Sequence, residues 1–339
     1  MAVRSASELP LSAELASELE QNQKQLIGLV IDPAFRLHDT GLGHPESPQR
    51  LEAIEAELQR RGLIQRCRLI QARPAVDREL LRCHTASYLQ TVRREVAYGA
   101  AQLSTGDTTI GEHSEDVARL AAGGTLAAVD AVLAGRVNHA FALVRPPGHH
   151  AEADRGMGFC IFNNVALAAR HAQAVHGLER VLIIDWDLHH GNGTQAMFWN
   201  DPSVLYTSVH EWGNYPGSGA AEERGEGAGL GFTLNCPLPA YSDGKALLTA
   251  LDAALAPVVA RFRPQLVLVS AGFDGHRDDP LGHFLLEDAD YTALTQLCLA
   301  IAAEHAGGRL VSVLEGGYGL KGLAGGAAAH VEALLAAST

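Results

Sequence analysis

From Ser114 onward, helical stretches and short apolar runs alternate regularly, and this alternation restricts the chain to very few architectures. The apolar runs are rich in Val, Leu and Ile, as expected of strands buried on both faces, and they span 140–144, 181–184, 204–209, 232–235, 266–270 and 309–314. Helices are predicted at 114–134, 163–176, 193–199, 243–261, 288–305 and 325–337. Such a pattern packs as right-handed βαβ crossovers. We therefore predict an α/β fold with a central, mostly parallel β-sheet and helices on both of its faces.

The first part of the chain is less regular. The predicted elements are a strand at 26–31, a helix from Pro48 to Arg61 with Ser47 as N-cap, a helical stretch at 77–100 and a long loop at 101–113. Residues 1–25 are polar and predict a loose arm or a surface helix. No linker or repeat divides residues 26–339, and α/β sheets of this length commonly form one domain.

Composition excludes several classes of protein. A net charge of −13 leaves no basic face for sequence-independent binding of nucleic acid. The five cysteines are scattered without a C-x-x-C pair, which argues against a disulfide framework and fits a reducing cytoplasm. No signal peptide is visible, and no apolar run approaches the ~20 residues that span a bilayer. We expect a cytoplasmic protein without a membrane partner, and homo-oligomerisation is left open.

Polar side chains cluster at the carboxyl ends of four predicted strands. The clusters are His149/His150, Asp185/Asp187/His189, Asp274 and Tyr318. In a parallel α/β sheet, ligands bind outside the carboxyl ends of the strands. Four clusters in the same topological position therefore predict a single active site.

The Asp-x-Asp-x-His cluster is typical of a metal site. Side chains alternate along a strand, so Asp185, Asp187 and His189 are predicted to point to the same side. Carboxylates and imidazoles are common oxygen and nitrogen ligands. Asp274 is the best third ligand, and a strand-end turn or helix cap is the alternative for it. Two carboxylates and one imidazole leave room for water and substrate, as catalysis requires.

The tandem pair His149-His150 follows Pro-Pro-Gly on a stiff loop. The two histidines are either metal ligands or a general base and acid beside the metal. Each imidazole needs an orienting partner, and Asp185 and Asn192 are available. Tyr318 lies among glycines, and it either donates its phenol O–H to a developing oxyanion or covers the edge of the core.

Several long motifs, in this order, resemble the histone deacetylase/acetylpolyamine amidohydrolase family, and in particular its bacterial members similar to class II deacetylases. The resemblance runs from about Gly28 to Glu332. The matching motifs are HPESPQR (44–50), RPPGHH (145–150), GMGFCIFNN (156–164), DWDLHHGNGT (185–194), SAGFD (270–274) and EGGY (315–318). The resemblance implies an arginase-like single-domain fold, with residues 26–339 as a zinc-dependent deacetylase domain.

The resemblance also implies how the site is divided. One catalytic Zn²⁺ would be bound by Asp187, His189 and Asp274. His149 would pair with Asp185 and assist electrostatically. His150 would be the general base and acid, with Asn192 as its partner in the class II pattern. Tyr318 would stabilise the oxyanion.

One or two structural K⁺ ions are implied by the same resemblance. The first site would use Asp185, Asp187, His189, Ser208 and Val209. The second would use Phe198, Asp201, Val204 and Phe232, mostly through backbone carbonyls.

The implied activity is zinc-dependent removal of acetyl or other short acyl groups from the amine of acyl-lysine-type substrates. Gly158 and Phe159 are candidates for a narrow substrate passage, although Phe159 also suits the core. The resemblance adds Tyr215 as a second wall and Asp107 as an acceptor for the substrate backbone. Leu281 stands where one polyamine-selective branch carries Glu, which favours an acylated lysine peptide or protein over an acetylated polyamine.

Three other functions are weighed against this one. A ureohydrolase of the same fold would hold two manganese ions, for which Asn192 is a poor bridging ligand. A non-catalytic acyl-group binding or regulatory protein would tolerate a damaged site, whereas every expected catalytic residue is present. The glycines at 227, 229 and 231 suggest a nucleotide-binding loop, but they precede a strand instead of joining a strand to a helix.

Overall fold

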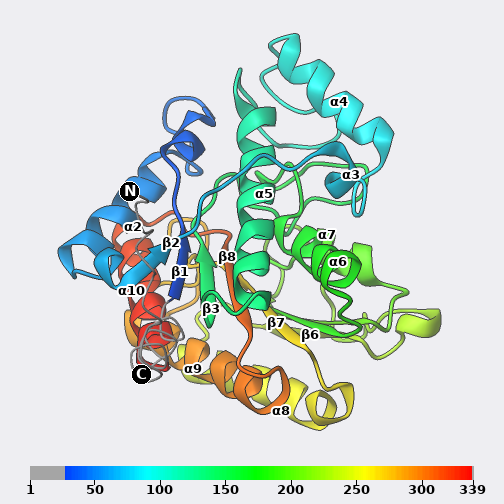
Figure 1. Cartoon of the computed structure of the whole chain (residues 1–339), viewed down its shortest axis with the longest axis vertical. Coiled ribbons are helices and arrows are strands. Elements are labelled where there is room, and N and C mark those ends of the chain that lie inside the picture. The colour runs from blue at the N-terminus through cyan, green and yellow to red at the C-terminus, as the bar shows by residue number, and fades with distance from the viewer. Residues whose placement is uncertain (1–26, 338–339) are drawn as a thin grey trace, which may run out of the picture.

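The computed structural model describes residues 27–337, so the arm or helix predicted for residues 1–25 lies outside the described residues. Its centre is one eight-stranded sheet with all neighbouring strands parallel, in the order β2-β1-β3-β8-β7-β4-β5-β6 (Figure 1). The strands are β1 (Ile27–Val30), β2 (Cys67–Leu69), β3 (His139–Ala142), β4 (Val181–Asp185), β5 (Val204–Glu211), β6 (Thr233–Leu238), β7 (Leu266–Ala271) and β8 (Leu310–Leu314). The predicted α/β fold is confirmed.

Helices cover both faces of this sheet (Figure 1). One face carries α5 (Ser114–Leu133) and α6 (Asn164–His176), with the shorter α3 (Asp77–Leu80), α4 (Ala86–Ala97) and α7 (Asn192–Phe198). The other carries α2 (Gln49–Arg60), α10 (Leu320–Ala337), α9 (Asp288–His305) and α8 (Gly244–Phe262), each packed on the next. In the described part of the chain, three 3-10 turns lie in connections, at Pro33–Leu37, Ile64–Arg66 and Gly227–Gly229. None of the helices within residues 27–337 is both long and apolar enough to cross a membrane.

The crossover into β4 shows how local sequence places the site. The Asn163 side chain accepts the backbone N–H of Ala166 and so caps the start of α6. Gly177 ends the helix in the left-handed conformation, with φ of 69°. The chain then enters β4, which is buried along its whole length between the two helical layers.

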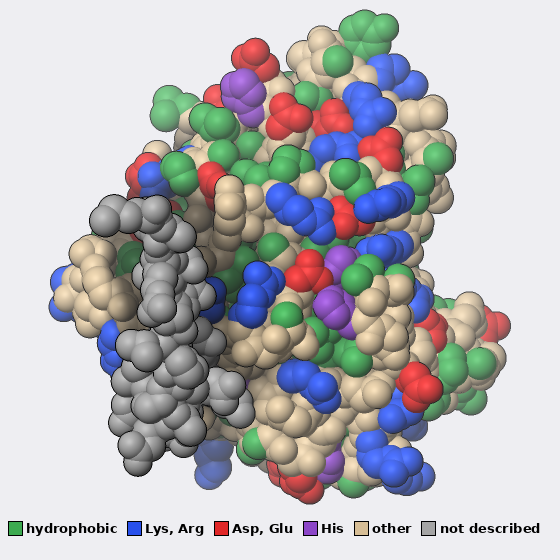
Figure 2. Space-filling view, viewed as in Figure 1, with side chains coloured by type: hydrophobic (Ala, Val, Ile, Leu, Met, Phe, Trp, Pro, Cys, Tyr) green, Lys and Arg blue, Asp and Glu red, His purple; other side chains and the backbone are tan. Residues whose placement is uncertain are grey.

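On the face seen in Figure 2, basic and acidic side chains are interspersed and form no large basic patch.

Some element boundaries differ from the predictions. The stretch 77–100 splits into α3 and α4, because Thr85 has an extended backbone and its side chain caps α4 at the N–H of Tyr88. Helix α2 begins after Pro48, which stands at the N-cap position predicted for Ser47. The short edge strand β2 is partly exposed, and its sequence carries no long apolar run that would have predicted it.

Helix α10 begins at Leu320, five residues before the predicted start at 325. Glycines disfavour a helix on propensity alone, but here they allow close packing. A Cβ atom on Gly326 would lie 2.8 Å from Phe273 and 2.9 Å from Tyr291. Tertiary packing therefore outweighs the low helix propensity of this glycine.

Candidate metal centre and active site

Four neighbouring strands deliver the polar clusters to one edge of the sheet. The strands β3, β8, β7 and β4 are adjacent in the strand order. Their carboxyl ends lead to His149/His150, Tyr318, Asp274 and the segment 185–189, respectively. Parallel strands present their carboxyl ends at the same edge, so segments far apart in the sequence meet there.

The side chains of Asp187, His189 and Asp274 are buried and converge on one point. His189 Nδ1 lies 3.1 Å from Asp187 Oδ1 and 2.9 Å from Asp274 Oδ2. Burial and the neighbouring carboxylate of Asp187 raise the pKa of Asp274 to about 7. A divalent cation would relieve the repulsion between the two carboxylates, and this set of oxygen and nitrogen donors suits such an ion.

Backbone groups and glycines hold these carboxylates. Gly316 N–H donates to Asp187 Oδ2 at 2.7 Å, and Leu188 N–H donates to Asp274 Oδ1 at 2.8 Å. A Cβ atom on Gly272 or on Gly316 would lie 2.1 Å from a carboxylate oxygen of Asp187 or of Asp274, respectively. The site therefore requires glycine at both positions, and the remaining oxygens, Asp187 Oδ1 and Asp274 Oδ2, face His189.

The prediction that Asp185, Asp187 and His189 share one strand face is wrong. Strand β4 ends at Asp185, so the other two residues lie in the loop that follows. Asp185 Oδ1 accepts the N–H of Asp187 at 3.2 Å, and Asp187 Oδ1 accepts the N–H of His189 at 2.9 Å. Two successive side chain-to-backbone turns therefore orient the loop. They leave Asp185 Oδ2 directed at His149, at a distance of 3.0 Å from Nδ1.

The rings of His149 and His150 are in contact at a tilt of 44°, with centroids 4.1 Å apart, but they have opposite electrostatic surroundings. Burial opposes protonation of His149, yet the carboxylates of Asp187 and Asp185 raise its pKa well above the ordinary value. His150 Nδ1 faces Asn192 Oδ1 at 2.8 Å, and burial together with the adjacent His149 lowers the pKa of His150 well below the ordinary value. These surroundings favour the cationic form of His149 and the neutral form of His150, which can accept a proton.

The loop after β8 carries Tyr318. Asp279 Oδ2 accepts the N–H of Tyr318 at 2.6 Å, and the guanidinium of Arg50 lies 5.0 Å from the centroid of the phenol ring. Burial raises the pKa of Tyr318 well above its ordinary value. The phenol therefore keeps its proton and can donate it in a hydrogen bond.

Aromatic side chains lie beside His150 and Tyr318. The rings of Tyr215 and His150 lie 5.1 Å apart, and Phe159 packs edge-on against Tyr318 at 5.7 Å. Gly158 lies between these walls with φ of 56°, and a Cβ atom there would lie 2.3 Å from His150 and 2.9 Å from Tyr215. The structure therefore places Phe159 beside the site and not in the core.

The remaining substrate candidates lie around the same walls. Asp107 Oδ1 accepts the N–H of Gly158 at 2.7 Å and the O–H of Tyr215 at 3.3 Å. The carbonyl of Leu281 accepts from Asn214 Nδ2 at 3.2 Å, next to Tyr215 in the chain. Asp107 thus joins two walls of the passage, and the backbone of Leu281 is hydrogen-bonded to Asn214, the residue before Tyr215.

The two groups of potassium candidates implied by the resemblance lie at different places in the fold. The first group lies at the end of β4 and on β5, where Asp185 pairs in register with Ser208. It also contains Asp187, His189 and Val209. The second group lies near the start of β5, where the carbonyl of Phe198 accepts the N–H of Asp201 at 3.0 Å and that of Phe232 accepts the N–H of Tyr206 at 2.9 Å. Val204 is the first residue of β5.

Sequence reasoning missed two buried acids that hold the site. Glu315 Oε2 accepts the N–H groups of Gly148 and His149 at 2.6 and 3.1 Å, and Oε1 accepts from Ser270 Oγ at 3.0 Å. Glu46 is buried, and its Oε1 lies 2.5 Å from Arg145 Nε and 3.0 Å from Arg50 Nη1. Glu46 lies in the motif HPESPQR and Glu315 in the motif EGGY, so the motifs that carry the family resemblance could have pointed to both residues.

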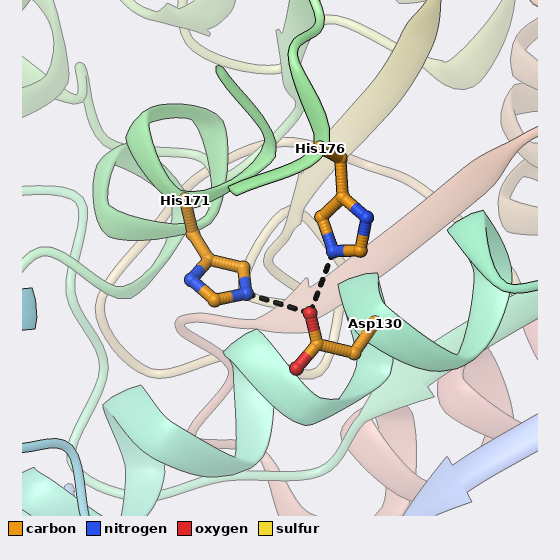
Figure 3. Close-up of side chains that lie close together, drawn as sticks. All are labelled: Asp130, His171 and His176. Atoms are coloured by element: carbon orange, nitrogen blue, oxygen red, sulfur yellow. Dashed lines mark hydrogen bonds and ion pairs between the residues drawn. The ribbon is translucent and has the colours of Figure 1, made fainter. Parts of the chain in front are cut away.

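A second group of possible ligands lies where the strands begin. Asp130 of α5 approaches His171 and His176 of α6, with Asp130 Oδ1 at 2.7 Å from Nε2 of each imidazole (Figure 3). Arg82 Nη1 lies 2.9 Å from His171 Nδ1. A guanidinium only donates, so a neutral His171 carries its proton on Nε2, facing Asp130. A histidine that binds a metal normally donates its other ring N–H to an acceptor, but at His171 that position faces Arg82, which is itself a donor. We therefore interpret the group as a set of hydrogen bonds that join α5 to α6.

Comparisons with known proteins agree with this geometry. A model of the histone deacetylase domain matches residues 44–334. The chain is 45% identical over 277 residues to a histone deacetylase-like amidohydrolase of Pseudomonas aeruginosa, covering 81% of this chain and 73% of that protein. It is 44% identical over 301 residues to the polyamine deacetylase HDAC10 of Homo sapiens, covering 86% of this chain and 44% of that protein.

A solved structure gives the same result for the fold. The crystal structure of the HDA15 HD domain superposes with a TM-score of 0.87 at 39% identity, covering 92% of this chain and 90% of that one.

Proposed function

The chain belongs to the histone deacetylase family, and on that premise we propose that it is a zinc-dependent amidohydrolase that removes acetyl or other short acyl groups from acyl-lysine-type substrates. The observation that carries the proposal is the buried group Asp187, His189 and Asp274 beside the His149-His150 pair. We assign the deacetylase domain to residues 26–339. Its cytoplasmic location stays a prediction.

Asp187, His189 and Asp274 would hold the catalytic ion, with His189 Nδ1 as its nitrogen ligand. Zn²⁺ in such a site supplies Lewis acidity, which polarises the amide carbonyl and makes water easier to deprotonate. One or two K⁺ ions at the two groups described above, one at the end of β4 and one near the start of β5, are part of the same proposal. A bound dinuclear manganese pair would instead favour a ureohydrolase.

The chain's own residues would move the protons. His150 presents its Nδ1 proton to Asn192, so Nε2 has a lone pair that can take the proton of the attacking water and later return it to the leaving amine. Cationic His149, held by Asp185, would stabilise negative charge that develops beside it. The Tyr318 phenol would donate to the oxyanion, a contribution of about 3 kcal/mol.

Two substrate classes are proposed, in order. Acyl-lysine peptides come first, because Leu281 stands where, by the family resemblance, one polyamine-selective branch carries Glu, and so it brings no carboxylate to attract a second amine. Acetylpolyamines come second, prompted by the human relative whose name is polyamine deacetylase.

The test is a kcat/KM panel of acetyl-lysine peptides, longer acyl-lysines and acetylpolyamines with zinc-loaded enzyme. Leu281→Glu should shift the preference toward acetylpolyamines, and Leu281→Gln, its uncharged counterpart, should not. No hydrolysis of any member by zinc-loaded enzyme would refute the proposed function.

A further inference from the structure

Asn192 presents an amide to His150, and an amide can face its neighbour in two orientations of nearly the same shape. With Oδ1 toward His150 Nδ1, at the observed 2.8 Å, the imidazole carries its proton on Nδ1 and keeps a lone pair on Nε2. With the NH₂ group there instead, Nδ1 would accept and the proton would sit on Nε2. Only the first orientation leaves neutral His150 able to take a proton from water.

Glu152 distinguishes the two orientations. Asn192 Nδ2 donates to Glu152 Oε1 at 2.8 Å, and it also approaches two further acceptors at 3.4 Å, the carbonyl of His150 and the sulfur of Met157. An ionised carboxylate accepts hydrogen bonds and donates none. Turning the amide over would set its oxygen against the oxygen of Glu152, so this acid favours the orientation that His150 needs.

The carboxylate of Glu152 is itself held in place. Arg155 Nη2 donates to the same Oε1 at 2.8 Å, and Glu152 N–H donates to the carbonyl of Arg155 at 2.8 Å. His84 Nε2 accepts the N–H of Asn163 at 3.0 Å, so its Nδ1–H donates to the carbonyl of Glu152 at 3.0 Å. The Glu152 side chain is 25% exposed, on the wall of a surface cavity of about 680 Å³. The hydrogen bonds to Arg155 and His84 nevertheless hold the turn that carries Glu152 in place.

We propose that Glu152 is a positioning residue of this active site, which fixes the amide of Asn192 and thereby the tautomer of His150. This proposal rests on the proposed function, because it takes His150 as the base. An aspartate at position 192 would present an oxygen to His150 in either orientation. The need for Glu152 is therefore tied to the amide of Asn192.

The first test reverses the hydrogen-bonding character of position 152. Glu152→Lys places a group that only donates beside the amide and so favours the wrong orientation. Since a general base contributes about 10²–10⁴-fold, we expect kcat to fall at least about 30-fold, with KM changed less than about 3-fold. Asp154→Lys makes the same charge change at an exposed position of the same turn, and it should stay within about 2-fold of the wild type because exposed charges are screened.

The second test repeats the change in Asn192→Asp enzyme. There the lysine pairs with a carboxylate that still accepts from His150 Nδ1, so adding Glu152→Lys should lower kcat less than about 3-fold. Equal losses in both backgrounds would overturn the proposal, because a merely structural role of Glu152 predicts them.

A milder variant guards against misfolding. Glu152→Gln is isosteric, and its amide tolerates both orientations of Asn192, so we expect a loss of about 3–10-fold in kcat alone. Unchanged turnover in this variant would also overturn the proposal. Zinc content and melting temperature are measured for each protein. Inactive zinc-loaded wild-type enzyme would refute the proposed function instead, and that result is read separately.

Discussion

Asp279 ties the loop of Tyr318 to the loop after β7, and its removal tests how the phenol is positioned. The side chain is buried. Its Oδ2 accepts the N–H groups of Tyr318 and Gly319 at 2.6 and 3.0 Å, and its Oδ1 accepts the N–H of Leu281 at 3.0 Å. One carboxylate therefore satisfies three backbone donors.

Asp279→Ala leaves these three donors without their acceptor. Each hydrogen bond to a charged group contributes about 1.5–3 kcal/mol, so the loop faces a penalty of several kcal/mol and is expected to shift to regain partners. In the proposed mechanism a displaced phenol would no longer donate to the oxyanion, and losing one such donor lowers kcat by about 10²–10³-fold. We therefore expect Asp279→Ala to lose roughly 100-fold in kcat, about as much as Tyr318→Phe.

The assay is kcat on an acetyl-lysine peptide, with zinc content measured in parallel. Because both changes disable the same donor, the double variant should be no worse than Tyr318→Phe, and all three proteins should retain zinc. Asp279→Asn keeps an oxygen acceptor and should lose less than about 10-fold. Multiplicative losses, about 10⁴-fold in the double variant, would refute the reasoning, as would near-wild-type turnover of Asp279→Ala.

Three further outcomes are expected. Asp185→Asn keeps a side-chain oxygen for the N–H of Asp187 but removes the carboxylate charge that pairs with His149, so kcat should fall about 10–100-fold with zinc binding unchanged; a parallel loss of zinc would contradict this. Burial lowers the pKa of His330 to about 3 in the folded protein, whereas an unfolded histidine has a pKa of about 6.5. The contribution of His330 to the free energy of unfolding is therefore fully present above about pH 6.5, and it is lost as the pH falls toward the folded-state pKa, because the unfolded chain binds the proton more readily. In urea unfolding from about pH 7.5 to about pH 5, wild type should lose roughly 2 kcal/mol more than His330→Gln, and equal losses would contradict this. Glu46→Gln leaves the buried guanidinium groups of Arg145 and Arg50 without their anion. The free energy of unfolding should therefore fall by about 3–5 kcal/mol. A decrease below about 1 kcal/mol in thermal unfolding would show that these ion pairs do not stabilise the fold.

The parallel sheet and the common edge of the site were predictable because they depend on local signals. The run 181–184 is apolar throughout and is followed directly by acidic residues. Because parallel strands place their carboxyl ends at the same edge of the sheet, the position of these acids follows from the strand assignment. The directions of Asp187 and His189 were not predictable in this way. Their loop is shaped by two side chain-to-backbone hydrogen bonds, and strand alternation cannot foresee where a strand stops.

Supporting acids were the hardest features to predict. Glu315 accepts the N–H of Gly148 across 167 positions of sequence, and Asp279 accepts the N–H of Tyr318 across 39. Nothing in the neighbouring residues of either acid indicates its partner. Glu152 is similar, because its contact with Asn192 exists only once α7 packs beside the His149-His150 loop.

The central claim is that one zinc ion at Asp187, His189 and Asp274 drives amide hydrolysis. It is tested by stripping the purified chain with a chelator, restoring single metals, and measuring both bound metal and turnover of an acetyl-lysine peptide. The expected result is one zinc per catalytic site with restored turnover, and loss of both in Asp274→Ala. Two manganese ions per chain, or full turnover after complete removal of metal, would contradict the account.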